Sequence, residues 1–162
     1  MIHESYPWKL DLRRRLRLIE KHNVSGLLER DDDSAYTVLE KSVFYSAFII
    51  RKLLECVKLS DEAERYSFQA IGIKPVKRID RMNHWPDEKS HDWGNEIRLS
   101  VKGKDLCNWL IHSYVFFFVH EEAGSISEFC ISSDYDRNKI LYRIALGDWI
   151  SYMKYISSDD IT

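Results

Sequence analysis

The residues best suited to chemistry lie in one short stretch of the second half of the chain. Asp105, Asn108 and His112 recur at i, i+3 and i+7, so a helix would place them on one face. An imidazole transfers protons near neutral pH, and an amide one turn earlier can fix its orientation. The same pattern also suits a structural role, in which Asn108 and His112 satisfy backbone groups of a packed core. The residue types alone leave both interpretations open.

At these residues the sequence resembles the HEPN family of small helical proteins. Many members carry an arginine followed at a short interval by a histidine. Often an asparagine follows the arginine, and in one subgroup a tyrosine lies two residues after the histidine. Asn108, His112 and Tyr114 match that pattern. The resemblance implies metal-independent RNA cleavage, in which the arginine and histidine of two subunits meet across a dimer cleft. It also implies a setting in bacterial toxin–antitoxin or antiviral systems.

The chain departs from the family pattern at Cys107, which stands where the family's ribonucleases have arginine. Arginine there would neutralise the phosphate and its developing charge, and a thiol cannot do so. Cleavage would therefore need another cation, for which Arg51 is the candidate. In that case His112 would be the acid–base group, Asn108 its orienter and Arg51 the phosphate partner. Without such a cation, the resemblance implies a diverged member that is not a nuclease.

A second group of candidate residues is a cluster of arginines near the N-terminus. Arg13, Arg14, Arg15 and Arg17 crowd a predicted helix over 7–22. They could bind phosphates of RNA or DNA, with an affinity that falls steeply with salt. Alternatively, they form a solvated helix face paired with acids such as Glu20 or the run 31–33. The net charge of -2 gives no overall nucleic-acid signal.

The sequence predicts no metal site and no cofactor. His84 and His91 match no familiar zinc spacing, and the chain has no glycine-rich phosphate loop. The three cysteines are odd in number, lie far apart and sit among apolar residues, which favours free thiols in a reducing compartment. No apolar run is long enough to cross a bilayer. We therefore expect a cytoplasmic protein without a membrane partner.

The elements that would position these residues indicate an α+β fold in a single domain over 1–162. Residues 1–70 are predicted to be helical, with helices over 7–22, 34–58 and 61–70. The mixed part, 95–157, is predicted to hold a strand over 96–101, the helix of the candidate motif, a three-stranded antiparallel meander over 114–145 and a C-terminal helix over 148–156. The stretch 72–95 gives no clear pattern; it could pack over the core or carry a binding surface.

The long helix over 34–58 is predicted to be the spine of this fold. Leu39, Val43, Ala47, Ile50, Leu54 and Val57 form its apolar stripe. Phe44, Phe48 and Leu53 widen the stripe, which predicts burial on more than one side. The consecutive Phe116, Phe117 and Phe118 point to both faces of their strand, so both faces need a cover. A second copy of the chain is one candidate for that cover.

Together these observations favour a small, non-enzymatic interaction or regulatory module with a protein partner or a homodimer as its assembly. The alternative is a diverged, metal-independent endoribonuclease of HEPN type. A third hypothesis is nucleic-acid binding through Arg13, Arg14, Arg15 and Arg17 without catalysis.

Overall fold

A computed structural model describes residues 1–30 and 33–161. Over this part of the chain it has helices α1 (Tyr6–His22), α2 (Ser25–Leu28), α3 (Ser34–Glu55), α4 (Asp61–Glu64), α5 (Gly103–Ile111) and α6 (Leu146–Ser157), and strands β1 (Ser67–Ile73), β2 (Ile97–Lys102), β3 (Ser113–His120), β4 (Ile126–Ser133) and β5 (Leu141–Ala145). The predicted α+β fold with a C-terminal helix is confirmed.

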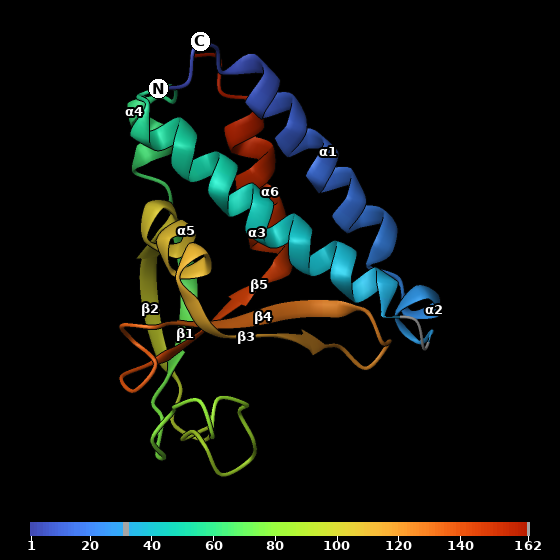
Figure 1. The fold of residues 1–162 in the computed structure, drawn as a ribbon, viewed down its shortest axis with the longest axis vertical. Coiled ribbons are helices and arrows are strands. Elements are labelled where there is room, and N and C mark those ends of the chain that lie inside the picture. The colour runs from blue at the N-terminus through green and yellow to red at the C-terminus, as the bar shows by residue number, and fades with distance from the viewer. Residues whose placement is uncertain (31–32, 162) are drawn as a thin grey trace.

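The five strands form one antiparallel sheet in the order β2-β1-β5-β4-β3. The predicted meander is present as β3, β4 and β5, and it forms one side of this larger sheet. Figure 1 shows α1, α3 and α6 together on one side of the sheet. The segment between β1 and β2, which is mostly loop, extends on the side away from these helices. The main core therefore lies between helices and sheet, where Phe68, Phe129 and Ile144 of the strands are buried.

The strand β1 corrects the prediction of a helix over 61–70. The helix ends at Glu64, and Ser60 caps it by accepting a hydrogen bond from the Ala63 amide at 3.2 Å. From Ser67 onward burial alternates, with Phe68 and Ala70 inside. This period of two is that of a strand with one face on the core. The strand inserts between β2 and β5, so the helical part of the chain stops before residue 67.

The helix α3 is the spine of the fold, as predicted, but its exposed side differs from the prediction. Leu39, Val43 and Ile50 are buried. In contrast, Val57 lies beyond the helix in a left-handed conformation and is 74% exposed. Phe48 is 45% exposed rather than part of the core. Even so, within the described residues no helix combines the length and apolar character that crossing a bilayer requires.

Helix α1 and the residues that follow α6 tie the two ends of the described chain together. The nearly buried Lys9 on α1 donates from Nζ to the backbone oxygens of Asp159 and Ile161, at 2.6 Å each. The Asp159 carboxylate accepts a hydrogen bond from the Ser60 side chain at 2.5 Å. Segments from both ends and from the middle of the sequence therefore meet at one place.

The segment between β1 and β2 covers part of the sheet face opposite the helices. Ile79 packs in a small second core with Ile73 and Leu141, and Trp93 flanks it. A bridge joins Pro75 to the buried His91. Of the two roles considered for this segment, packing over the core is the one that the contacts support.

Gly103, the first residue of α5, lies against the buried ring of Tyr152. A Cβ added at Gly103 would overlap that ring, which is fully enclosed in the core. We expect Gly103→Ala to lower the free energy of unfolding by about 1–3 kcal/mol, the usual cost of overpacking. Urea denaturation measures this change in the free energy of unfolding. The Tyr152 hydroxyl has no hydrogen-bond partner in the described chain, so Tyr152→Phe should be nearly neutral alone and should reduce the cost of Gly103→Ala. Equal stability of Gly103→Ala and wild type would contradict this packing.

Candidate functional site

The predicted polar face of α5 lies at the surface, beside the turn between β4 and β5. His112 is the C-terminal cap of the helix and is exposed, whereas Asn108 is half-buried. Both line a shallow pocket of about 330 Å³, and the other lining residues are Trp109, Ser133, Asp134, Tyr135 and Asp136. The exposed Asp105 is not among the residues that line it. The Asp134 amide donates to the His112 carbonyl at 3.0 Å, which fixes the turn against the helix end.

Arg51, the cation suggested from the sequence, lies next to the imidazole. Its Nη1 is 3.5 Å from Nε2 of His112, although the two residues come from different helices. The Arg51 Nε also donates to the Glu55 carboxylate at 2.7 Å. Hydrogen bonds from Lys52 and Arg51 lower the pKa of the Glu55 carboxyl to about 2, so this acid stays ionised. Arg51 therefore approaches His112 with part of its charge already balanced.

The amide oxygen of Asn108 and the side chain of Cys107, the residue before it, are both buried. The Oδ1 atom of Asn108 is buried and has no hydrogen-bond partner in the described chain. The Asn108 backbone oxygen, not its side chain, bonds to the His112 amide at 3.0 Å. Cys107 is fully buried, and burial raises the pKa of its thiol far above the ordinary range. The residue at which the resemblance to HEPN ribonucleases would require arginine thus lies inside the core of this protein.

The N-terminal arginines do not gather into one patch with this pocket. They lie on α1, on the opposite flank of α3 from α5 (Figure 1). Arg13 donates to the Ser157 carbonyl at 2.7 Å, while Arg14 and Arg17 are exposed. Arg15 packs over the ring of Tyr45. Of the acids considered as their partners, Glu20 pairs instead with Lys154 at 3.2 Å. In the run 31–33, residues 31 and 32 lie outside the described part of the chain.

Comparison with known proteins found no matching family model, no matching curated protein and no matching solved structure. Within residues 1–30 and 33–161, no group of three or more His, Cys, Asp or Glu side chains is arranged to hold a metal ion. The site must therefore be judged on its own geometry.

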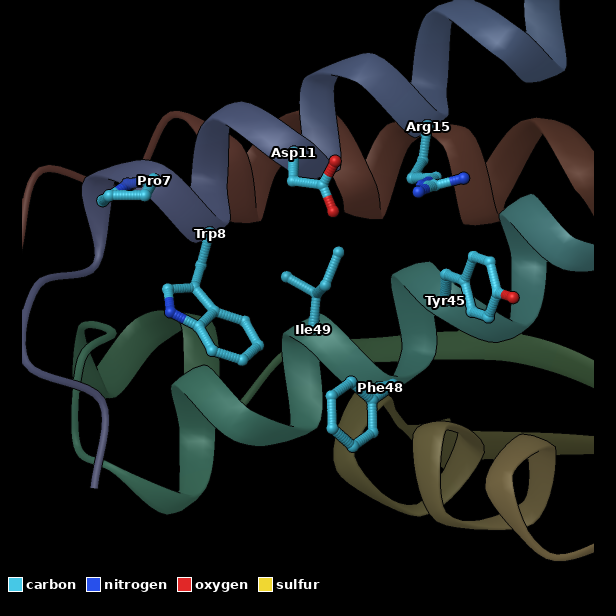
Figure 2. A pocket seen from close by; sticks show the side chains of 7 residues that line it. All are labelled: Pro7, Trp8, Asp11, Arg15, Tyr45, Phe48 and Ile49. Carbon is cyan, nitrogen blue, oxygen red and sulfur yellow. The ribbon is translucent and has the colours of Figure 1, made fainter.

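Another hollow with mostly apolar walls lies between α1 and α3. It has a volume of about 340 Å³ and is lined by Pro7, Trp8, Asp11, Arg15, Tyr45, Phe48 and Ile49. Figure 2 shows the Asp11 and Arg15 side chains entering it from α1, with Tyr45, Phe48 and Ile49 on α3 opposite. We call it the α1–α3 groove. This groove was not predicted from the sequence, because Phe48 was assigned to the buried side of the long helix.

Proposed function

We propose that this protein is an interaction module that binds a helical segment of a partner protein in the α1–α3 groove. The observation that carries the proposal is the pair of aromatic rings at the groove surface, since Tyr45 is 46% and Phe48 is 45% exposed. Large apolar side chains left open beside a hollow are typical of binding surfaces rather than of a monomer's outer face. Trp8 packs 6.4 Å from Phe48 between ring centroids and makes the apolar wall continuous.

Two opposite charges border this apolar wall. Asp11 and Arg15 lie four residues apart on α1, and no ion pair joins them or links Asp11 to another described residue. The guanidinium carbon of Arg15 is 4.8 Å from the centre of the Tyr45 ring. Its Nε is buried and has no hydrogen-bond partner in the described chain. The groove therefore offers an anion and a cation one helical turn apart.

A helix is the partner element that matches this arrangement. Its apolar side chains recur at i, i+3 and i+4, which suits a groove between two helices. Its charged side chains four residues apart stand about 6 Å along the axis, as Asp11 and Arg15 do on α1. The expected segment thus presents large apolar residues to Phe48 and Ile49, a base to Asp11 and an acid to Arg15.

Selection of helical peptides from a displayed library tests this function directly. The selected peptides should share an apolar face and a base and an acid spaced by four residues. Phe48→Ala should weaken their binding at least about tenfold, as expected for an aromatic anchor at the centre of an interface. Fluorescence anisotropy with a labelled selected peptide measures the dissociation constant.

Two further variants make this test specific. Tyr135→Ala removes an exposed aromatic ring outside the groove and should leave the dissociation constant unchanged. The double variant Asp11→Lys with Arg15→Glu should prefer peptides in which the two charges are exchanged. A selection without a charge pattern, or peptides that bind Phe48→Ala as tightly as wild type, would refute the proposed function.

Metal-independent RNA cleavage at the α5 pocket is the second candidate function. The specific observation in its favour is the 3.5 Å approach of Arg51 to His112, which supplies a cation that the motif itself lacks. Against it stand the pairing of Arg51 with Glu55 and the two acids, Asp134 and Asp136, in the pocket wall. Acids there repel a phosphate, so we rank this function below the interaction module. A cytoplasmic location and a place in a toxin–antitoxin or antiviral system remain predictions from the sequence.

A further inference from the structure

The two edges of the sheet differ in how they are protected. The edge strand β2 carries Arg98 and Lys102, and charged residues on an edge discourage pairing with another strand. The opposite edge strand, β3, has no charged residue and no proline from Ser113 to Val119. In the described part of the chain, β3 pairs with β4 on one side and with no strand on the other. Its outer backbone groups are therefore open to a further strand.

The sequence of β3 is palindromic in its central part. The five residues from Val115 to Val119 read Val-Phe-Phe-Phe-Val in both directions around Phe117. These same five residues keep a regular ladder with β4, because the register shifts lie just outside them, between Ser113 and Val115 and between Val119 and His120. The five residues that keep a regular ladder with β4 are thus the same five residues whose sequence is symmetric.

In an antiparallel pair of two such strands, each of these residues faces a residue of the same type. With a two-fold axis at Phe117, that ring faces its own copy, Phe116 faces Phe118, and Val115 faces Val119. Aromatic and β-branched pairs of this kind are the favourable cross-strand contacts of sheets. Phe116 and Phe118 would extend the helix-covered face, since Phe116 already packs 4.8 Å from Phe44 of α3 between ring centroids.

The charges at the two ends of β3 also favour this orientation. Glu121 and Glu122 follow the strand and are exposed, whereas His112, with Arg51 beside it, precedes the strand. Of the acids near the His112 end, Glu55 is bound by Arg51 and Lys52 and Asp134 by Arg137, whereas Asp136 has no ion pair within the described chain. Antiparallel pairing brings Glu122 of one copy toward His112 of the other. Parallel pairing would instead place the glutamates of both copies together.

We propose that a second copy of this chain pairs with β3 through its free edge, which joins two five-stranded sheets across a two-fold axis at Phe117. This assembly does not depend on the α1–α3 groove, which lies on the helices. It also differs from a homodimer that covers the face of the strand, because here the backbone edge is the surface used.

Charge substitution at the axis tests this assembly. Light scattering after size-exclusion chromatography should give wild-type protein the mass of two 19.3 kDa chains. Phe117→Lys and Phe117→Glu should each be monomeric, because each places two like charges together at the axis. An equimolar mixture of the two variants should recover the dimer, because the charges then attract. Ser100→Lys, on the other edge of the sheet, should remain dimeric.

Several outcomes would overturn the proposal. These are a wild-type monomer at the highest concentration reached, dimers that persist in both Phe117 variants, and folded variants that stay monomeric when mixed. Near-ultraviolet circular dichroism reports whether the variants are folded. If they are not, amide hydrogen exchange of the wild type decides, since those amides of residues 115–119 that do not bond to β4 should gain protection as concentration rises. Protection independent of concentration would likewise refute the edge pairing.

Discussion

Replacing Trp149 with alanine is expected to lower the free energy of unfolding by about 3–5 kcal/mol, a large part of the stability of an ordinary domain. The indole is fully buried where α6 meets the sheet, and it contacts the rings of Phe68, Phe129 and Tyr152. Its Nε1 donates to Oγ of Ser46 on α3 at 3.1 Å. The substitution thus leaves a cavity at the point where α6, α3 and the sheet meet.

Urea denaturation measures this loss, and two variants separate its causes. Trp149→Phe keeps most of the volume and removes the hydrogen bond together with a small part of the packing, so it should cost clearly less. Ser46 Oγ would still donate to the Val43 carbonyl at 2.8 Å. Trp85→Ala is the matched control, because that indole is 71% exposed and its removal should change the stability by less than about 0.5 kcal/mol. A loss of under about 1 kcal/mol in Trp149→Ala would mean that the core is not packed as described.

If the α5 pocket cleaves RNA, His112→Ala should reduce the cleavage rate by about 10²–10⁴-fold, the usual contribution of a positioned acid–base group. Arg51→Ala should also reduce it, because the guanidinium is the cation beside the imidazole. End-labelled RNA incubated with each purified protein and resolved on a denaturing gel measures the rate. A chelator should leave the wild-type rate unchanged under a metal-independent mechanism.

A second histidine variant shows whether a contaminating nuclease is the source of any cleavage. His84→Ala removes an exposed imidazole from the segment between β1 and β2, far from α5 in the fold, and should cleave like wild type. Cleavage that is equal in wild type, His112→Ala and His84→Ala would come from a contaminant. That result, or no cleavage by any of them, would leave the interaction module as the only supported function.

Much of the fold could be predicted from local signals in the sequence. The apolar stripe indicated α3, and the β-branched and aromatic residues of β3, with turn residues on either side of β4, indicated the meander. The strand β1 was missed because Ala70 and the acids of 61–64 suit a helix, and its partners β2 and β5 are distant in sequence. Pairing with such distant strands decided the structure of this segment, and local propensity does not contain that information.

The candidate site was predictable only in part, for a similar reason. The spacing of Asn108 and His112 placed both beside one pocket, and the suggestion of Arg51 as a nearby cation agrees with its 3.5 Å distance from His112. The α1–α3 groove needed knowledge of how two helices pack. Helix α3 supplies the floor of the groove, and α1 supplies its charged residues. The periodicity of α3 alone does not indicate that Phe48 is exposed rather than buried.

The anchoring of Lys9 by the backbone of Asp159 and Ile161 has a consequence for synthesis in the cell. Nearly the whole sequence separates these partners, so α1 can pack on α3 early but lacks this contact, and its packing on α6, until residues 146–161 have left the ribosome. The N-terminal helices must then wait with apolar surface uncovered, which is the condition that invites chaperone binding. A nascent chain stalled before residue 146 should therefore be more sensitive to protease than the released protein.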